Sequence, residues 1–319
     1  MHSSETIDSM ALLRHQSFAR LPLYKDSQEA LAKQRSYISR ATEKAEQTGA
    51  VHLKHDGTQV QAFLLYWTEK ESWYGVETQN CIIHSRPSEE TGLAWLKSCL
   101  ENEVSNFNTN FDLILDASDV DIRQFFLNAH FHIDALILIG ETAVALKQLS
   151  NKPEQARTKD LGLEVVPLKD HEFITEVSEL KQKVFSQNKA CWFALNPQFI
   201  INENEALRES LDQNQPLYLI KSAGNTVGYF GSHIEDTNTY WGSVGNLEFV
   251  LDPSIQGKGL ARELYRIVLS DLHSAGTKTF KGGSSNPAVL HLSKTMGRQL
   301  SATVIRKGPS LKRDFAPYI

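Results

Sequence analysis

The sequence predicts an α/β (α+β) protein of two domains, each with a mixed, mostly antiparallel central sheet flanked by helices. Three observations support this. The 319 residues are about twice the length of a typical domain. Hydrophobic residues make up 41% of the chain and charged residues 22%, which is enough to fill a core in each half. In the second half, short apolar runs and amphipathic stretches follow the order βααβββαβαβ, which mixes hairpins with crossover helices.

A repeated pattern supports the division into two domains. Residues 51–63 and 218–230 share Lys, Gly, Val and Phe at a constant spacing of 167, and the same spacing places Gly92 on Gly259. With a spacing of 166, residues 111–126 lie on 277–292. We therefore expect a duplicated domain, although two unrelated α/β domains remain an alternative. The expected parts are a first domain over 1–147, a linker with Pro153 over 148–160, a second domain over 161–307 and a tail over 308–319.

Hydrophobic periodicity and turn residues predict each element of the second half in order. The strands are expected over 163–166, 217–221, 226–234, 241–251, 277–281 and 302–306, and the helices over 171–185, 203–212, 257–274 and 287–296. A further strand over 142–146 precedes the linker. The first copy has no room for a counterpart of the strand over 163–166. Its sheet edge therefore needs a cover, for which the tail is a candidate, unless the sheet is simply smaller.

Charge and composition exclude several classes of partner. There are 33 Lys and Arg residues against 38 Asp and Glu, a formal net charge of −5 without long runs of one sign. We therefore expect no nucleic-acid or membrane partner, because both require a concentrated basic face. The N-terminal residues carry Glu5 and Asp8 without an apolar core, and no membrane-spanning run follows, so we expect a cytoplasmic protein. Three cysteines without CxxC spacing predict neither a disulfide framework nor a metal site (Cys81, Cys99 and Cys191).

The most informative stretch is a glycine-rich loop between a long strand and a helix. The strand ends at Asp252-Pro253, and a turn brings Gln256-Gly257-Lys258-Gly259 to the first turn of the helix. Glycines let a ligand approach the backbone, and the free N–H groups of a helix start bind phosphate. Neither the Walker pattern nor the dinucleotide pattern fits the glycine spacing. The loop predicts a phosphate or pyrophosphate site, and the alternative is a turn that binds nothing.

Two motifs of this half resemble those of a known family. The segment Pro253-x-x-Gln256-x-x-Gly259-x-Ala261 is similar to the acyl-CoA pyrophosphate signature of the GCN5-related N-acetyltransferases (GNAT). The family also has an Asn that opens a short helix, a Tyr seven residues later, and Gly-Phe at eleven and twelve. Here Asn286 is followed by Ser293, Gly297 and Arg298 at those spacings, so the tyrosine and the phenylalanine are missing. The resemblance covers the second half directly and the first half only through the repeat.

The resemblance implies transfer of an acetyl group from acetyl-CoA to a primary amine of a small molecule or peptide, without a metal. It implies that the main chain of one strand pairs with the pantetheine arm (Phe249, Val250 and Leu251). The backbone of the loop would hold the pyrophosphate, with one arginine beside it (Gln256, Gly257, Lys258, Gly259, Leu260, Ala261 and Arg262). Asn286 would contact the pantetheine. The oligomeric state stays open between monomer and homodimer.

The catalytic residues are less clearly marked than the binding residues. Glu248 resembles the family's recurrent carboxylate base, although a polar position on a half-buried strand is an alternative, and His233 is a second candidate base. Ser293 occupies the position of the usual tyrosine acid but is shorter and a poorer acid, so a water or another tyrosine could replace it. A non-catalytic acyl-CoA-binding or scaffold protein is therefore the alternative function. Acyl transfer from charged tRNA is disfavoured because it requires a basic surface.

The first copy lacks the features of the phosphate loop. Its counterpart of the loop is Glu89-Glu90-Thr91-Gly92-Leu93-Ala94, where two carboxylates would repel a pyrophosphate. Asn286 maps to Val120 and Ser293 to Leu127. We therefore expect that residues before Gln148 bind no acyl-CoA. Four aromatic residues of the second half are candidates for the acceptor side (Trp192, Phe193, Tyr240 and Trp241).

Overall fold

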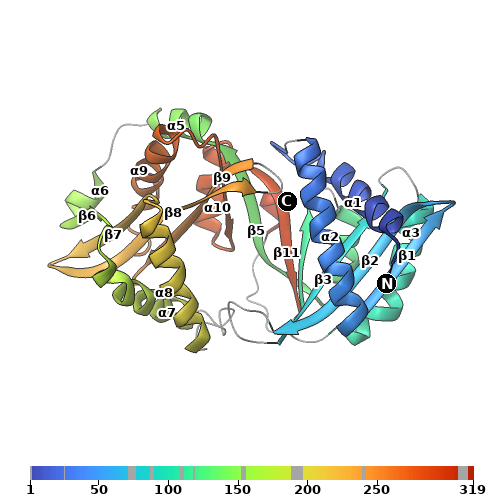
Figure 1. Ribbon diagram of the computed structural model, residues 1–319. Coiled ribbons are helices and arrows are strands. Elements are labelled where there is room, and N and C mark those ends of the chain that lie inside the picture. Colours follow the sequence, from blue (N-terminus) through green and yellow to red (C-terminus); the bar gives the residue numbers. More distant parts are fainter. Residues whose placement is uncertain are drawn as a thin grey trace.

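The computed structural model describes residues 2–24, 26–70, 77–86, 90–107, 111–117, 119–151, 156–187, 197–238, 242–307 and 315–319. Its strands form one continuous sheet in the order β1-β2-β3-β4-β11-β5-β10-β9-β8-β7-β6, which runs through the whole molecule (Figure 1). The strands are β1 (Gly49–Asp56), β2 (Gln59–Lys70), β3 (Glu77–Ser85), β4 (Phe111–Asp116), β5 (His132–Glu141), β6 (Leu163–Pro167), β7 (Leu217–Ser222), β8 (Asn225–Asn238), β9 (Gly242–Leu251), β10 (Thr279–Ser284) and β11 (Gln299–Arg306). The α-helices are α1 (Ser4–Phe18), α2 (Gln28–Thr48), α3 (Glu90–Glu103), α4 (Val120–Asn128), α5 (Thr142–Ser150), α6 (Arg157–Asp160), α7 (Ile174–Ser186), α8 (Pro197–Asp212), α9 (Ala261–Ser274) and α10 (Pro287–Thr295).

The same succession of strand pairings occurs twice. β1, β2 and β3 pair antiparallel and β3 pairs parallel with β4, while β7, β8 and β9 pair antiparallel and β9 pairs parallel with β10. A helix and a final strand follow in each half, and β6 opens the second half alone. The predicted fold class is therefore confirmed, and the second half has the predicted order βααβββαβαβ.

The last strands of the two halves are exchanged. β5 pairs antiparallel with β10, β11 pairs antiparallel with β4, and β5 and β11 pair with each other. Each half therefore contributes a strand to the sheet of the other. A division of the chain into 1–147 and 161–307 stays a proposal from the sequence, and these two segments interleave at the centre of the sheet.

The register of the repeat is 166 in the hairpins, so the alignment at 167 was wrong there. Both hairpins turn through two residues, Gly57-Thr58 and Ala223-Gly224, and both have an irregularity at the same point. By this register Phe63 corresponds to Tyr229. These two side chains pack under the first two helices of their halves, whereas Phe230 packs toward α9. A slip of one residue exchanges the faces of a strand, so the matches at 167 joined residues from opposite faces.

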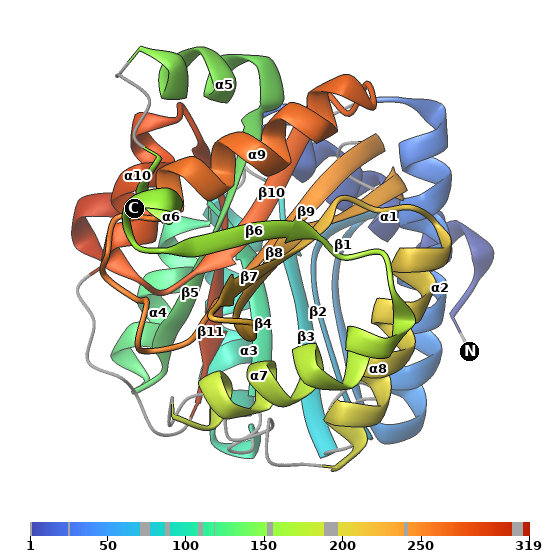
Figure 2. The same ribbon diagram turned by 90° about the vertical axis from the view of Figure 1, so that its left-hand side faces the viewer.

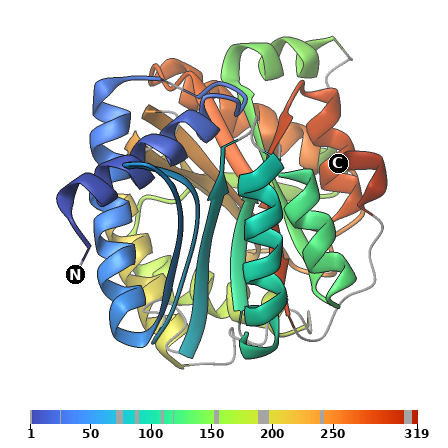
Figure 3. The same ribbon diagram turned by 90° about the vertical axis from the view of Figure 1, so that its right-hand side faces the viewer.

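Helices cover both faces of the sheet. α1 and α2 pack on one face of the sheet in the first half, and α7 and α8 pack on the same face in the second half. Both helix pairs cover aliphatic and aromatic strand residues. α3 and α4 pack on the other face of the first half, and α5 and α9 on that of the second half. Figure 3 shows the sheet between α1 and α2 on one side and α3 and α4 on the other, and Figure 2 shows α7 and α8 on the opposite side from α9.

Two local predictions are wrong. Residues 142–146, predicted as a strand, begin helix α5, because Ala145 and Leu149 lie one helical turn apart and are both buried. The helix predicted from Gly257 begins at Ala261, after the loop. The described end of the tail, 315–319, lies against α10 and does not cover the edge strand β1. The rest of the tail lies outside the described residues, as do Pro153 and most of the linker before α6.

No described helix is both long and apolar enough for a membrane span.

Candidate functional site

A cleft opens where β9 and β10 diverge. The two strands pair only between Val244–Asn246 and Thr279–Lys281. Beyond that point residues 247–251 pair with β8 alone and residues 282–284 with β5 alone. The divergence opens a cleft of about 620 Å³, within the range of small-molecule sites. Its walls come from both strands, the loop before α9 and the first turn of α10. Val184 of α7 and Arg298, the residue before β11, complete the lining.

The glycine-rich loop forms one end of this cleft and leaves backbone amides open. Gly257 and Gly259 have φ angles of +72° and +80°, and open space surrounds both α-carbons. The side chain of Gln256 donates a 2.7 Å hydrogen bond to the carbonyl of Leu251, which fixes the loop to the end of β9. Leu260 is the N-cap of α9, and no described side chain caps the helix. The first amides of α9 are therefore available to an anion in the cleft.

Most of the other predicted binding residues line the same cleft, but its described lining includes neither Val250 nor Arg262. Phe249 and Leu251 line the cleft, whereas Val250 points into the core under α7 and α8. Val250 is 1% exposed, so its side chain does not reach the cleft. Asn286 lines the cleft and accepts a hydrogen bond from the Ala288 amide, which caps α10. Arg262 has a buried Nε without a described hydrogen-bond partner.

Glu248 belongs to a buried ion-pair cluster on the opposite face of β9. Lys181 of α7 donates hydrogen bonds to Glu248 at 2.8 Å and to Glu203 of α8 at 2.5 Å. Burial alone raises the pKa of Glu248, but the Lys181 ammonium and His233 together lower it to about 2. Burial also raises the pKa of Glu203. Glu248 is therefore a permanent anion at neutral pH and a weak base.

His233 stands beside this carboxylate. Its Nε2 lies 3.7 Å from the Glu248 carboxylate, and its Nδ1 is 2.7 Å from the Ser210 hydroxyl. The imidazole is 30% exposed and Glu248 is 27% exposed. A carboxylate on one side and a hydroxyl on the other hold the ring in place, which is a common setting for a proton acceptor.

Ser293 is buried below the floor of the cleft. The Arg298 guanidinium donates to the Ser293 hydroxyl at 2.9 Å and to the carbonyls of Leu138 and Gly282 at 2.6 and 3.0 Å. Ser293 is 0% exposed, so its hydroxyl supports Arg298 and does not itself face the cleft. Burial raises the pKa of the Tyr265 phenol, and Arg298 and Ser293 oppose this rise.

Comparisons with known proteins fit this geometry. Residues 180–297 match the model of the acetyltransferase (GNAT) family. They form a GNAT acetyltransferase domain. No curated protein matches the chain in sequence.

Solved structures share the fold over almost the whole chain. A GCN5-related N-acetyltransferase from Sphaerobacter thermophilus has a TM-score of 0.57 at 10% identity, covering 98% of this chain and 97% of that chain. A GNAT-family acetyltransferase from Colwellia psychrerythraea has a TM-score of 0.54 at 10% identity, covering 96% and 97%. A tandem GNAT protein from the clavulanic acid biosynthesis pathway has a TM-score of 0.51 at 13% identity, covering 97% of both chains. At these identities the similarity establishes the fold.

Four residues that line the cleft were not singled out as site residues from the sequence. Gly282 and Gly283 lie where β9 and β10 diverge, and two glycines inside a strand are a signal for close approach of a ligand or backbone. Tyr265 lines the cleft with its ring centre 4.4 Å from that of Phe249, and no motif in the sequence marked it. Arg298 was noted only as a departure from the family phenylalanine, and its burial depends on the exchanged strand β5.

The first copy differs from the GNAT domain at the corresponding positions. α4 and α10 are both nine residues long and follow Asp119 and Asn286 as N-caps. Asn286 therefore corresponds to Asp119, and Ser293 corresponds to Phe126, which is fully buried. The counterparts assigned from the sequence, Val120 and Leu127, are one residue out of register. Glu90 is exposed at the start of α3, and Glu89 lies outside the described residues, as do Trp192, Phe193, Tyr240 and Trp241.

The described residues bring together no group of three or more metal-ligating side chains.

Proposed function

We propose that the chain transfers an acetyl group from acetyl-CoA to a primary amine, at a site in its second half. The observation that carries this proposal is the divergence of β9 and β10. Their pairing stops at Asn246 and Lys281, and the cleft between them opens beside the start of α9, which no described side chain caps. One end of the cleft offers backbone amides to a pyrophosphate. The other end offers the unpaired edge of β9 to an amide-bearing arm. We also propose that this is the only acyl-CoA site, with the first copy as a supporting domain.

The binding residues follow from this arrangement. The amides from Gln256 to Ala261 would hold the pyrophosphate, with Lys258 and the Arg262 Nε as further donors. The edge of β9 from Phe249 to Leu251 would pair with the pantetheine, and Asn286 would contact it from α10. The open space at Gly257 and Gly259 fits a phosphate-bearing ligand.

We assign different roles to Glu248 and His233. The acceptor arrives as an ammonium ion and must lose a proton before its nitrogen can attack the thioester. A carboxylate with a pKa of about 2 attracts the ammonium but accepts its proton poorly. Glu248 therefore positions the amine, and the neighbouring His233 accepts the proton. The N–C bond then forms as the C–S bond breaks, and the electron pair of the C–S bond leaves on the CoA thiolate.

Arg298 stabilises the thiolate leaving group in place of a tyrosine acid. Its guanidinium lies at the wall of the cleft next to Gly282, where the strands begin to diverge. A fixed cation at this place stabilises the developing thiolate without donating a proton. Ser293 and Tyr265 hold the guanidinium in position, and Ser293 is thus a positioning residue.

Isothermal titration calorimetry with acetyl-CoA tests the binding site. We expect the unaltered protein to bind and Gly259→Asp to lose binding, because the new carboxylate lies on the pyrophosphate loop. Gly224→Asp is the matched control, since Gly224 also has a positive φ (+84°) and open space but lies in a distant hairpin turn. Absence of binding by the unaltered protein, or binding that Gly259→Asp leaves intact, would refute the proposal.

Turnover is measured separately, as release of the CoA thiol with a panel of primary amines. We expect Glu248→Gln and His233→Asn to lower turnover while acetyl-CoA binding persists. Binding without turnover of any amine would favour the non-catalytic alternative.

A further inference from the structure

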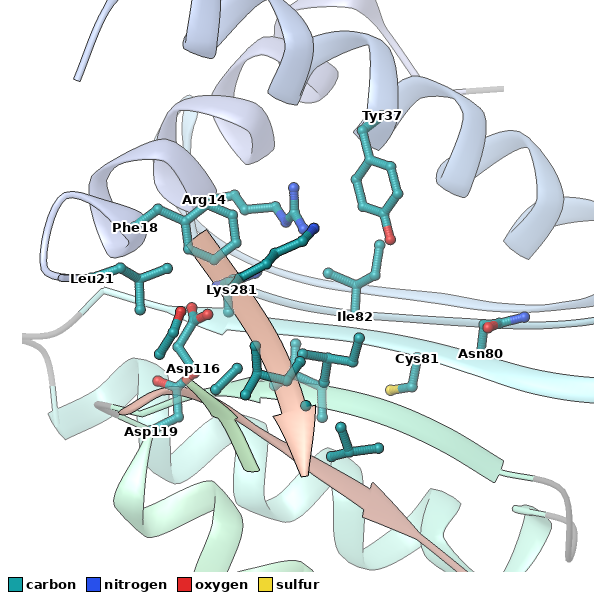
Figure 4. Close-up of a pocket in the computed structure, with 18 of the residues that line it drawn as sticks. Arg14, Phe18, Leu21, Tyr37, Asn80, Cys81, Ile82, Asp116, Asp119 and Lys281 are labelled. Atoms are coloured by element: carbon teal, nitrogen blue, oxygen red, sulfur yellow. The ribbon is translucent and has the colours of Figure 1, made fainter. Parts of the chain in front are cut away.

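A second cavity, of about 470 Å³, lies on the opposite face of the sheet (Figure 4). α1 and α2 cover it, and its floor crosses the sheet from β3 over β4, β11 and β5 to β10. Gly282 and Gly283 line both this cavity and the acyl-CoA cleft. The cavity also reaches Asn246, two residues before Glu248 on β9. The two spaces therefore meet at the point where β9 and β10 diverge, which is where the thioester would be presented.

The far end of the cavity contains a buried carboxyl group without a partner. Asp116, at the end of β4, is 6% exposed, and its buried Oδ2 has no hydrogen-bond partner among the described residues. Burial and the nearby Asp119 raise the pKa of Asp116, and Arg14 opposes this rise. Asp119 also lines the cavity, and Arg20 and Arg123 lie near it. A buried acid that no protein group satisfies is expensive to maintain, which is typical of a group that meets a ligand.

The cations that line the cavity have partners of their own. Arg14 donates to the buried Gln34 side chain, and its guanidinium lies 4.5 Å from the centre of the Phe18 ring. Lys281 donates a 3.0 Å hydrogen bond to Glu235. Asp116 thus differs from these groups, because no described residue forms a hydrogen bond with its Oδ2. The missing partner of Asp116 is a hydrogen-bond donor, and the most favourable donor to a buried carboxylate is a cation.

The floor between the two ends is aliphatic. It consists of Ile114, Ile137, Ala302 and Val304, and the Ile114 side chain is 59% exposed although it lies on a central strand. From β4 to β10 the floor crosses three strand spacings, which is about 14 Å. An occupant therefore has a polar end at Asp116, a hydrocarbon middle, and a reacting end near Gly283.

We propose that this cavity binds the acceptor, and that the acceptor is an aliphatic amine with a second cationic group bound by Asp116. This inference rests on the proposed function, since it places the reacting amine at the cleft. Allowing about 3 Å for the contact at Asp116, the two nitrogens are about 11 Å apart. At roughly 1.2 Å per bond of an extended chain, nine bonds span this distance, so long-chain diamines or polyamines have the right length.

Three probes of equal chain length test the nature of the far group. They are 1,8-diaminooctane, n-octylamine and 8-aminooctanoate, which carry a cation, a methyl group and an anion at the remote end. We expect kcat/KM for the diamine to exceed that for octylamine by about 10-fold or more, as for a hydrogen bond to a charged group, and aminooctanoate to be the poorest. Equal rates for the three, or a preference for aminooctanoate, would overturn the proposal. A preference for the anion would assign the far end to Arg14 instead.

A variant pair assigns the preference to Asp116. In Asp116→Asn the ratio of kcat/KM for diamine over octylamine is expected to fall toward one. The matched control is Asp121→Asn, because Asp121 is an exposed residue of α4 paired with Lys97 outside the cavity. A ratio that Asp116→Asn leaves unchanged would overturn the assignment.

Direct binding separates this proposal from the proposed function. Calorimetry measures 1,8-diaminooctane binding to the CoA-loaded protein, without any reaction. Diamine binding that depends on Asp116 supports the cavity even if turnover is absent, whereas octylamine turnover without diamine preference or binding overturns the cavity and leaves the acetyltransferase proposal standing.

Discussion

Lys181→Met is expected to destabilise the protein strongly. The Lys181 side chain is 3% exposed and donates to both Glu203 and Glu248, so its removal leaves a buried and a partly buried carboxylate without this cation. Breaking a buried pair by removing one partner costs about 3–5 kcal/mol. Lys183→Met is the matched control on the same helix. Lys183 is 59% exposed in its pair with Asp252, and such surface pairs contribute about 1 kcal/mol or less.

The loss in Lys181→Met should depend on pH, with a sign fixed by the direction of the pKa change. In the unaltered protein Lys181 helps lower the pKa of Glu248 to about 2, so this stabilisation is present above the unfolded pKa near 4.5 and disappears as pH falls toward 2. Without Lys181, burial raises the pKa of both carboxyls. The difference in unfolding free energy between the two proteins should therefore begin to shrink as pH falls from neutral through the raised pKa values of the variant's carboxyls, and shrink further below about 4.5.

Urea unfolding at several pH values between 4 and 8 measures this difference. Lys181→Met/Glu203→Gln should recover part of the loss, because it removes one of the two unpaired charges. A loss below about 1 kcal/mol at pH 7.5, or a loss that does not change with pH, would refute the buried triad as described.

Three further results are expected. Asp116→Asn should stabilise the protein by about 1–3 kcal/mol in urea unfolding, because it removes an unpartnered buried acid. The gain should grow as pH rises, because burial raises the pKa of Asp116 well above its usual value and that of Asp119 to about 6. A carboxyl with a raised pKa in the folded state destabilises the folded protein increasingly as pH rises from the unfolded pKa toward that raised pKa. A gain confined to acidic pH would contradict this. Calorimetric titration should give one acetyl-CoA per chain, and two sites would show that the first copy still binds. Arg298→Met should lower kcat about 100-fold with little change in acetyl-CoA affinity, and a Ser293→Ala loss equal to that of Arg298→Met would argue against the role of Arg298.

The sequence was most informative where chemistry is local. Glycines at 257 and 259 indicate a positive φ and an open helix start, and these features depend on a few neighbouring residues. The strand and helix order of the second half follows from periodicity in the same way. The loop could therefore be placed between a strand and a helix from its residues alone, whereas its association with the main chain of β9 came from the family resemblance.

Long-range pairing decided the rest. The sequence did not indicate that β5 and β11 are exchanged, because strand order depends on contacts between residues more than 150 positions apart in the chain. The register of the repeat could not be read from the sequence either. Four chance identities favoured an alignment that is shifted by one residue, and such a shift exchanges the two faces of a strand.

By itself the sequence determined the glycine-rich loop before a helix, the order of elements in the second half and the family resemblance, because each depends on residues close together in the chain. Only the tertiary structure decided what surrounds the reacting groups. It placed Lys181 against Glu248, which makes that carboxylate a permanent anion, and it placed Arg298 beside Gly282. It also brought Asp116 of the first half into one cavity with Gly283 of the second. The energies of buried charges depend on neighbours from distant segments, and a linear pattern does not contain them.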